Sequence, residues 1–211
     1  MMRGKFITLE GTEGAGKSTA RLFIMNYLEK AGLKVVVTRE PGGTDIAEAI
    51  RNVLLHRASD EIMLSETELL LMFAGRAQHI HHRIKPALQS GKWVLSDRYI
   101  DASYAYQGGG RGLSLAFIKA LDKEIVGDWY PDLTILLDVP AEIGMARAES
   151  RGGSKDRIER EKIDFFDRVR ATYLERAKRE PKRVKVIDAS LNLPDVQAQI
   201  QRVLDTFTAR S

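Results

Sequence analysis

A glycine-rich stretch, GTEGAGKST at residues 11–19, constrains the fold of this chain more than any other feature. It matches the pattern G-x-x-x-x-G-K-[ST] in full, follows the apolar run KFITLE at 5–10, and opens a segment with helical periodicity. In that context the backbone N–H groups of the loop and of the first helical turn face a chain of phosphates. The stretch therefore predicts a phosphate-binding loop between the first strand and the first helix of an α/β domain.

The motif also assigns roles to individual side chains. Lys17 is expected to bridge the β- and γ-phosphates of a nucleoside triphosphate, and Ser18, rather than the neighbouring Thr19, is expected to ligate Mg²⁺. Glu13 is unexpected in such a loop, because a carboxylate repels phosphate. The predicted ATP-binding residues are Gly11, Thr12, Glu13, Gly14, Ala15, Gly16, Lys17, Ser18 and Thr19.

Apolar runs and helical periodicities alternate along the rest of the chain, with a capping signal, SETE, at 65–68 and a glycine cluster, YQGGGRG, that predicts a loop at 106–112. The strand that follows the first helix is expected to be buried. This alternation predicts a central parallel five-stranded sheet with helices on both faces. Strands are predicted at 5–10, 33–38, 92–97, 132–139 and 183–189, and helices at 18–31, 44–55, 65–90, 114–126, 140–151, 154–180 and 193–207.

Composition narrows the class of protein. The chain has 211 residues, of which 44% are hydrophobic and 29% charged, as expected of a single soluble domain spanning 1–211. It has no cysteine, which excludes a disulfide scaffold and a thiol nucleophile and fits a cytoplasmic location. No apolar run approaches the length of a membrane helix, and the N-terminal segment lacks the apolar core of a signal peptide, so no membrane partner is expected. The net charge of +4 suits either a slightly basic surface or a cleft for a polyanion.

A triphosphate loop does not by itself define the reaction. The guanine-specific N-K-x-D motif of GTPases is absent, and a motor would need a larger chain or partner domains. The size fits a small kinase best, with a phosphoryl acceptor bound elsewhere in the chain. A nucleotide-sensing or nucleic-acid-binding module is the alternative from another class, although neither helix-turn-helix spacing nor an aromatic–basic RNA motif is visible.

Charged side chains recur where predicted strands end, at the sheet edge where ligands of parallel sheets bind. Asp97 and Arg98 follow one strand; Asp97 is expected to hold Mg²⁺ through water or to orient the acceptor, and Arg98 to grip a phosphate. Arg39 follows another strand. Arg51 and Arg76 lie in predicted helices, and Arg76 is surrounded by apolar residues, where an unpaired charge would be costly.

Two other features, a strand-end acid and a histidine cluster, each allow two interpretations. Asp138 ends a predicted strand and is either a second acid near Mg²⁺ or a turn residue. His79, His81 and His82 invite a metal interpretation, but no carboxylate or thiol completes such a site. The histidines are therefore predicted to lie on a solvated helix surface.

A basic, glycine-containing segment, RAESRGGSKDRIER at about 147–160, separates two predicted helices. Arg147, Arg151 and Arg157 are expected to close over the phosphates as a lid. Arginines in that position neutralise the charge that develops on a transferred phosphoryl group, an effect of about 10³–10⁵ in rate.

Taken together, these segments resemble bacterial thymidylate kinase over nearly the full chain. The resemblance implies a P-loop kinase fold, transfer of the γ-phosphoryl group of ATP to dTMP to give dTDP and ADP with Mg²⁺, and a homodimer. Another nucleoside or nucleotide kinase of the same fold is the alternative within enzymes. The matching pieces are FITLEGTEGAGKST, TREPGGT with AEAIR, RAQH, SDRY, SYAYQGGGRG, DLTILLDVP and DRIE…FFDRVR…YLE.

The resemblance implies roles around the sugar and phosphate of the acceptor. Glu13 matches a residue that approaches the 3′-hydroxyl, which would explain a carboxylate in a phosphate loop. Arg39 and Arg98 match positions near the monophosphate, and Arg51 lies in the same pocket. Tyr106 matches a tyrosine that would clash with a 2′-hydroxyl and so favour deoxyribonucleotides.

The resemblance also implies contacts to the base. Arg76 matches an arginine that reads the thymine edge, and Ser103 and Gln107 match polar contacts to the base. Where many relatives have a phenylalanine that stacks on thymine, this chain has Met72, with Phe73 one residue later. Either Met72 makes the contact through its soft sulfur, or Phe73 reaches in.

The loop itself indicates the subtype. Ala15 stands where relatives of the eukaryotic type have an arginine within the phosphate loop. The resemblance is therefore to the subtype that supplies its catalytic arginines from the lid, which favours Arg147 and Arg151 and, less strongly, Arg157.

Overall fold

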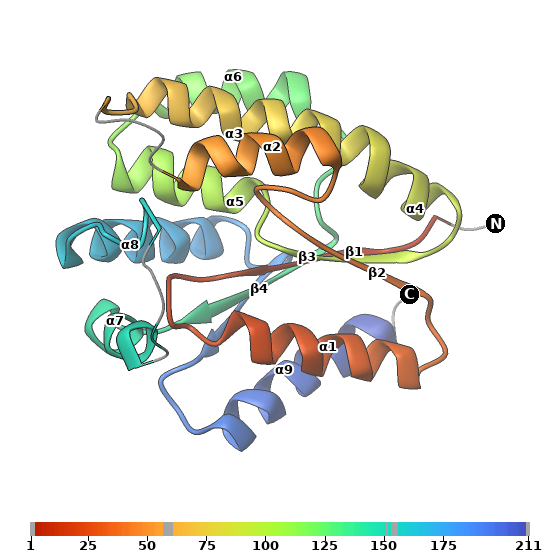
Figure 1. Ribbon diagram of the computed structural model, residues 1–211. Coiled ribbons are helices and arrows are strands. Elements are labelled where there is room, and N and C mark those ends of the chain that lie inside the picture. Colours follow the sequence, from red (N-terminus) through yellow and green to blue (C-terminus); the bar gives the residue numbers. More distant parts are fainter. Residues whose placement is uncertain (1–2, 57–60, 151, 153–155, 210–211) are drawn as a thin grey trace.

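In the computed structural model, which describes residues 3–56, 61–150, 152 and 156–209, a five-stranded parallel sheet forms the centre of the molecule (Figure 1). The strands lie in the order β2-β3-β1-β4-β5. This arrangement confirms the α/β fold class and the five parallel strands expected from the sequence. The strands are β1 (Phe6–Glu10), β2 (Val35–Arg39), β3 (Trp93–Asp97), β4 (Leu133–Asp138) and β5 (Val184–Asp188).

Helices cover both faces of the sheet (Figure 1). Two of them, α1 and α9, lie on one face, whereas α2, α3, α5, α6 and α8 lie on the other. No helix within the described residues is both long and apolar enough to span a membrane. The helices are α1 (Lys17–Lys30), α2 (Asp45–Leu55), α3 (Ser65–His79), α4 (Lys85–Gln89), α5 (Ile100–Ser103), α6 (Leu115–Ile125), α7 (Ala141–Ser150), α8 (Ile163–Arg179) and α9 (Leu193–Thr208), with π-helical η1 (Ile80–Ile84) and η2 (Tyr104–Gly110).

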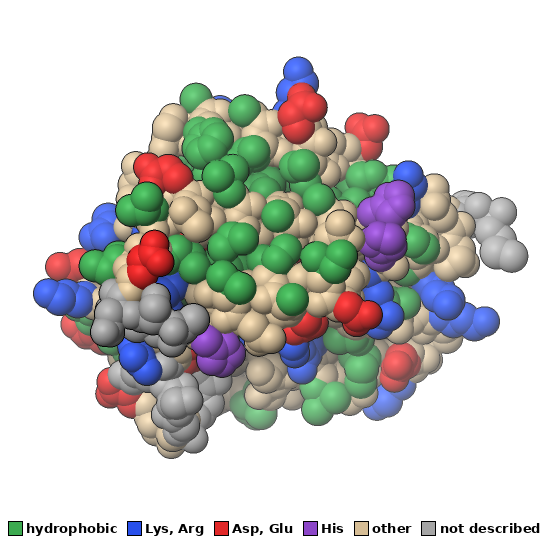
Figure 2. All heavy atoms as spheres, turned by 45° about the horizontal axis from the view of Figure 1, so that its top comes forward, with side chains coloured by type: hydrophobic (Ala, Val, Ile, Leu, Met, Phe, Trp, Pro, Cys, Tyr) green, Lys and Arg blue, Asp and Glu red, His purple; other side chains and the backbone are tan. Residues whose placement is uncertain are grey.

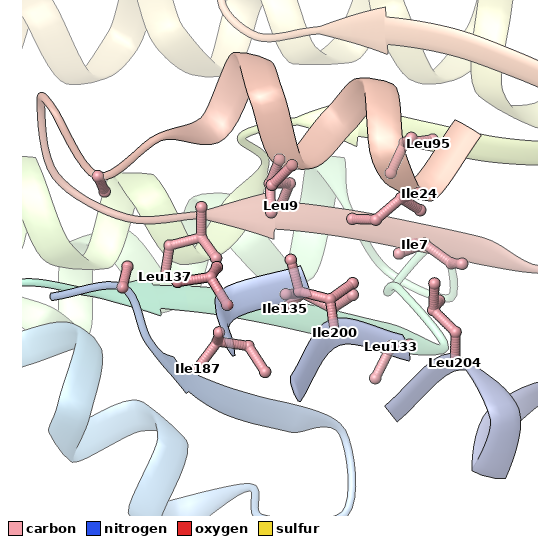
Figure 3. Close-up of a cluster of buried hydrophobic side chains, with 14 of the residues drawn as sticks. Ile7, Leu9, Ile24, Leu95, Leu133, Ile135, Leu137, Ile187, Ile200 and Leu204 are labelled. Carbon is pink, nitrogen blue, oxygen red and sulfur yellow. The ribbon is translucent and has the colours of Figure 1, made fainter. Parts of the chain in front are cut away.

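The central strands are continuous apolar runs because hydrophobic clusters cover both of their faces. Along β1, Ile7 and Leu9 point toward α1 and α9, where they meet Ile24 and Ile200 (Figure 3). Phe6, which precedes Ile7, packs into a second cluster on the opposite face. A strand covered on both faces has no solvent side, so polar alternation disappears.

The strand predicted as buried at 33–38 is instead an edge strand. Among the described residues, β2 pairs only with β3, and its residues Val35, Val36 and Val37 are half-buried. An apolar β-branched run indicates a strand but does not distinguish a central position from an edge.

The loop predicted at 106–112 is wrong for residues 106–110. The segment continues α5 as the π-helix η2 and packs against α8. A Cβ added at Gly109 would lie 2.0 Å from Thr172 Oγ1, so the glycine serves close helix packing rather than a turn.

The two long predicted helices also differ in the structure: one is divided and the other begins later. The one at 65–90 is divided into α3, η1 and α4, and its capping signal is not used: Glu68 turns inward and is 1% exposed. The one at 154–180 begins only at Ile163, because Asp156 accepts the backbone N–H groups of Ile158 and Glu159 in a local turn.

The register of the sheet positions the ligand edge. Leu9 of β1 pairs with Asp97 of β3, so both strands end side by side. The phosphate loop that follows β1 and the Asp97–Arg98 pair that follows β3 are therefore neighbours at the carboxyl edge, as expected for a parallel sheet.

Candidate active site

The phosphate loop leads directly into α1, whose first residue is Lys17. Gly16 precedes the helix with φ of 89°, in the left-handed region. Gly14 packs against α7: a Cβ at position 14 would lie 1.9 Å from the carbonyl oxygen of Gly144. The loop therefore keeps its shape only with glycine at these two positions.

Lys17 lies across the mouth of this loop. Its ammonium group donates to the carbonyl oxygens of Gly11 at 3.0 Å and Thr12 at 2.8 Å. Burial, with Arg98 nearby, lowers the pKa of Lys17 to about 8. The charge is thus poorly compensated in the ligand-free fold, and a polyanion would compensate it.

A cavity of ≈ 280 Å³ opens beside the loop. Residues of the phosphate loop form one wall, and residues of the predicted acceptor pocket form the other. Of the predicted site residues, the cavity is lined by Glu13, Gly14, Gly16, Lys17, Ser18, Arg51, Met72, Asp97, Arg98, Tyr106 and Gln107.

Glu13, Arg98 and Tyr106 meet inside this cavity. The two carboxylate oxygens of Glu13 accept from Arg98 Nη2 and from the Tyr106 hydroxyl, both at 2.7 Å. The Arg98 guanidinium also lies over the Tyr106 ring, 4.6 Å from its centroid. Glu13 therefore balances the charge of Arg98 and orients two side chains toward one space.

Arg51, Met72 and Gln107 form the far wall. Arg51 donates to the carbonyl oxygen of Pro41 at 2.8 Å, and burial together with Arg39 lowers its pKa. Gln107 donates to Glu68 at 2.7 Å, whereas its Oε1 atom is buried without a hydrogen-bond partner among the described residues. An unpartnered buried acceptor at a cavity wall matches a ligand donor.

Met72, and not Phe73, lines the cavity. Phe73 is 2% exposed within the core, where its ring lies 4.8 Å from the Arg76 guanidinium. Of the two contacts left open by the sequence, the geometry favours Met72.

Arg76 and Ser103 lie behind the cavity wall. Arg76 donates from Nε to Glu40 at 2.8 Å, from Nη1 to Ser103 at 3.0 Å and from Nη2 to the Tyr99 carbonyl at 3.1 Å. Although burial alone would raise the pKa of Glu40, Arg76 and His79 hold it below its usual value. The arginine thus has the buried partner that the sequence required of it.

The prediction that all three histidines lie on a solvated surface is wrong for His79. Its ring is fully buried between the Thr38 hydroxyl, at 2.7 Å, and Glu40, at 2.9 Å. His81 and His82 are exposed, as predicted. Helical spacing placed His79 and His82 on one face, but the helix changes to π geometry after His79, which changes that spacing.

Arg39 is not brought into the cavity. It forms an exposed ion pair with Glu48 at 2.9 Å and lines a neighbouring cavity of ≈ 480 Å³ together with Ser18 and Arg21. To reach the ligand space around Arg98, it would have to exchange Glu48 for another anion.

The predicted lid arginines have separate positions. Arg147 donates to the carbonyl oxygens of Ala189, at 2.7 Å, and Ser190, at 3.2 Å. Arg157 donates to Glu68 at 2.6 Å and to the Leu54 carbonyl at 2.9 Å. Neither lines the cavity, and Arg151 lies outside the described residues. Arg147 and Arg157 are thus both bonded to protein acceptors outside the cavity.

The remaining predicted residues complete the loop and its surroundings. Asp97 lines the cavity, and Arg21 at 4.0 Å is its one ion-pair contact among the described residues. Asp138 forms a bidentate ion pair with Arg170, at 2.7 and 2.9 Å, and does not line the cavity. Gly11, Thr12 and Ala15 are buried in the loop, whereas Ser18 and Thr19 are exposed.

Sequence reasoning missed several polar residues that hold this site. Glu10 and Ser96 are fully buried next to the loop and Arg98, and Glu40 and Glu68 each receive arginine side chains. A signal existed for Glu10, since a carboxylate ends an apolar strand directly before the loop. No local pattern identifies Glu68, because its partners are distant in sequence.

Comparisons with known proteins agree on one family. The model of the thymidylate kinase family matches residues 9–200. The thymidylate kinase of Ruthia magnifica is 55% identical over 207 residues, 98% of this chain and 100% of that protein, and the one of Pseudomonas syringae pv. tomato is 56% identical over 203 residues, 96% of each chain. The crystal structure of thymidylate kinase from Ehrlichia chaffeensis superimposes with a TM-score of 0.76 at 34% identity, covering 96% of this chain and 99% of that one. With these relatives and the family model in agreement, the chain belongs to the thymidylate kinase family.

Proposed function

We propose that this protein transfers the γ-phosphoryl group of ATP to dTMP, giving dTDP and ADP, in the cavity beside the phosphate loop. One observation carries the proposal: the triphosphate residues Lys17 and Ser18 and the acceptor residues Arg98 and Gln107 line the same cavity. A phosphoryl group can pass directly between two ligands only if they share such a space.

The chemistry requires positioning and charge neutralisation. An oxygen of the dTMP phosphate attacks the γ-phosphorus in line while the bond to the bridging oxygen of ADP breaks. Lys17 donates to the β- and γ-phosphates, exchanging the loop carbonyls for them, and Arg98 orients the attacking phosphate. Arg51, which lines the same cavity as Arg98, places a second positive charge near the acceptor phosphate.

Ser18 and Asp97 fit Mg²⁺ bound with ATP. This ion keeps phosphate oxygens and water as most of its ligands, so one carboxylate and one hydroxyl suffice. Both residues line the cavity, and within the described part of the chain no cluster of three or more histidine or acidic residues offers a metal cage of its own. When bound, Mg²⁺ supplies charge neutralisation at the phosphates.

The acceptor nucleoside is recognised along the far wall. Gln107 Oε1, which has no hydrogen-bond partner among the described residues, accepts from the N3–H group of thymine, and Met72 packs against the base. Glu13 receives the sugar 3′-hydroxyl, and Tyr106 limits the space for a 2′-hydroxyl. Arg76 and Ser103 act on the base from behind this wall, and Arg39 joins the phosphate after leaving Glu48.

The lid proposal concerns residues 147–160 of a single domain spanning 1–211. Asp156, Ile158 and Glu159 line the acceptor cavity, which supports a segment that covers bound ligands. Arg147 and Arg151 reach the transferred phosphoryl group when both substrates are bound, whereas Arg157 anchors the segment to Glu68. Covering the site excludes water that would otherwise hydrolyse ATP. A cytoplasmic location, where ATP and DNA precursors are made, completes the proposal.

The acceptor preference tests the proposed function. The purified protein is incubated with ATP, Mg²⁺ and one nucleoside monophosphate at a time, and ADP formation is measured. Strong turnover is expected with dTMP, weak turnover with dUMP and almost none with AMP, GMP or CMP. Preference for another monophosphate would reassign Gln107 and Arg76, and ATP turnover without any acceptor would argue against a kinase.

We further propose that two copies form a homodimer through α2, α3 and α6. Figure 2 shows hydrophobic side chains gathered over these helices, with charged ones mainly around the edge. An exposed apolar area of this kind on a soluble protein marks a binding surface, and a self-complementary face closes a two-fold dimer. Its exposed members are Ile46, Val53, Leu70, Leu115 and Phe117.

Replacing Leu70 by glutamate is expected to yield a monomer. Leu70 is 48% exposed within the apolar face, so the new charge would be buried without a partner in the dimer. Sedimentation velocity at micromolar concentration measures the mass. Leu22→Glu is the matched control, because Leu22 is 55% exposed on α1, across the sheet. A wild-type monomer, or loss of the dimer in the Leu22 variant alone, would contradict the proposed interface.

A further inference from the structure

The backbone of Arg98 has an unusual conformation. Its φ of 69° lies in the left-handed region, and no other non-glycine residue in the described part of the chain has positive φ. Such a conformation is unfavourable for a residue with a Cβ and persists only where the surroundings enforce it. It directs the guanidinium back over the loop, onto Glu13 and the Tyr106 ring.

Three hydrogen bonds enforce this conformation. The Arg98 N–H donates to the Leu9 carbonyl at 2.9 Å, and the Ser96 hydroxyl donates to the Arg98 carbonyl at 2.8 Å. The next N–H along the chain, that of Tyr99, donates to Glu10 Oε1 at 2.8 Å. Both peptide groups that flank Arg98 are therefore fixed, two of the three bonds being made by side chains.

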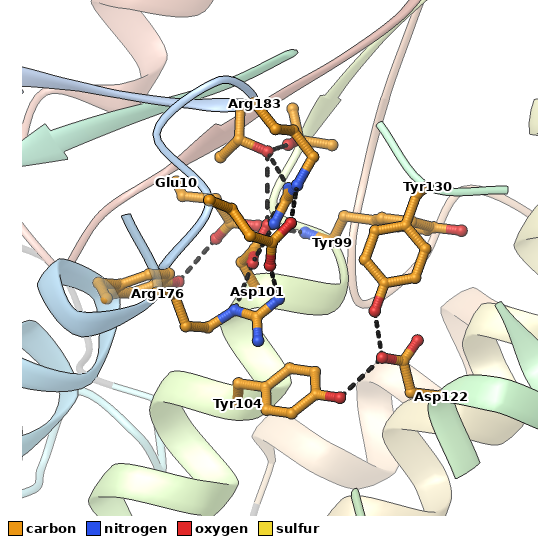
Figure 4. A network of polar contacts seen from close by, with 12 residues as sticks. Glu10, Tyr99, Asp101, Tyr104, Asp122, Tyr130, Arg176 and Arg183 are labelled. Atoms are coloured by element: carbon orange, nitrogen blue, oxygen red, sulfur yellow. Dashed lines mark hydrogen bonds and ion pairs between the residues drawn. The ribbon is translucent and has the colours of Figure 1, made fainter. Parts of the chain in front are cut away.

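Glu10 and Ser96 are fully buried and do not line the cavity. Glu10 comes from the end of β1, below the phosphate loop, and its contact with Tyr99 lies beside the ion pairs of Asp101 with Arg176 and Arg183 (Figure 4). Its second oxygen accepts the Tyr173 hydroxyl of α8 at 2.6 Å.

Burying this acid is costly. Burial, with Asp101 adding to it, raises the pKa of Glu10 to about 8. An apolar residue would fill the position without that cost, but it would leave the Tyr99 N–H without a buried acceptor. The use of an acid at this position is therefore explained by its oxygen, which accepts the N–H of the Arg98–Tyr99 peptide group.

We propose that Glu10 and Ser96 are positioning residues for the acceptor phosphate: they hold the left-handed backbone that aims the Arg98 guanidinium into the cavity. The inference rests on the proposed role of Arg98 in binding the phosphate of dTMP. Tyr173 extends the same support to α8, the helix that follows the lid segment.

The test compares binding of dTMP with binding of thymidine, which lacks the phosphate, by isothermal titration calorimetry. Ser96→Ala removes one hydroxyl and is expected to weaken dTMP about tenfold, the loss of one oriented charge-assisted contact, while thymidine affinity stays unchanged. Glu10→Ala is expected to act in the same direction and to lower kcat. Glu10→Gln is the matched control, because its amide oxygen still accepts the Tyr99 N–H, and it should bind dTMP as the wild type does.

Arg98→Ala separates this inference from the proposed function. If Arg98→Ala weakens dTMP but not thymidine while Ser96→Ala changes neither, the positioning inference is wrong and the proposed function stands. If Arg98→Ala leaves dTMP affinity unchanged, the role of Arg98 in the proposed function is wrong. Equal weakening of both ligands by Ser96→Ala would show a merely structural role and overturn the inference. Should Glu10→Ala not fold, Ser96→Ala decides the outcome.

Discussion

Replacing Lys17 by alanine is expected to lower kcat for phosphoryl transfer by at least about 10³-fold, since it removes the charge that neutralises the transferred group. The fold should remain intact. Burial and Arg98 already lower the pKa of Lys17, so its charge does not stabilise the ligand-free protein. A coupled assay for ADP gives kcat, and circular dichroism gives the melting temperature.

Lys30→Ala is the matched control for this prediction. Lys30 lies at the other end of the same helix, α1, and is exposed. Its variant should keep wild-type kcat and melting temperature. Substantial turnover by the Lys17 variant would remove Lys17 from the mechanism, and a large fall in its melting temperature would show that the lysine is needed for the loop itself.

Replacing Arg76 by methionine is expected to lower the free energy of unfolding by about 3–5 kcal/mol, the usual cost of leaving one partner of a buried ion pair uncompensated. Arg76 and Glu40 are both nearly inaccessible to solvent, and their ion pair spans 2.8 Å. Urea unfolding at neutral pH, without ligand, measures the difference.

The size of this loss should depend on pH. In the wild type, the pKa of Glu40 lies below its ordinary value of 4.5, so its pairing stabilises the fold above that pH and is lost on acidification. Without Arg76, burial raises the pKa of Glu40 in the folded state. Above the unfolded pKa, folding must then bind a proton, so the stability of the variant falls as the pH rises. The deficit should therefore be small near pH 4 and grow toward pH 8.

A double-mutant cycle provides the control. The double variant, Glu40→Gln with Arg76→Met, leaves neither charge unpaired. Its loss in the free energy of unfolding should therefore be smaller than the sum of the losses of the two single variants. Additive losses that are independent of pH would show that Arg76 stabilises the fold by packing on Phe73 and Tyr99 rather than by its charge.

The fold and the phosphate loop could be predicted from the sequence because their signals are local. The loop pattern, the strand before it and the alternation of elements fixed the parallel sheet, and register then brought Asp97 beside the loop. The position of β2 at the sheet edge and the π-helix at 104–110 could not be predicted in this way. Both depend on which neighbour an element meets, and glycines that suggest a loop instead allow α8 to approach.

In the candidate site, too, the residues with local sequence signals could be predicted and those with distant partners could not. Glu13, Arg98 and Tyr106, to which the family resemblance gave roles around the acceptor sugar and phosphate, line one cavity, but their direct contacts with one another were not predicted. Side chains with long reach, such as Arg39 and Arg147, could not be placed. An arginine pairs with whichever acceptor the fold brings near it, and Glu48 or the carbonyl of Ala189 is not visible as a partner in the sequence.

Glu68 joins two functions that a protein engineer would want to adjust separately. Its carboxylate receives Gln107 from the side of the cavity that we propose holds the base, Arg111 from the end of η2, and Arg157 from the proposed covering segment. A change at Gln107 made to admit a different base alters the hydrogen bonding of Glu68, and with it the anchor of the covering segment. Selectivity and turnover in this enzyme are therefore expected to change together, and a redesigned base pocket will need a compensating substitution at position 157.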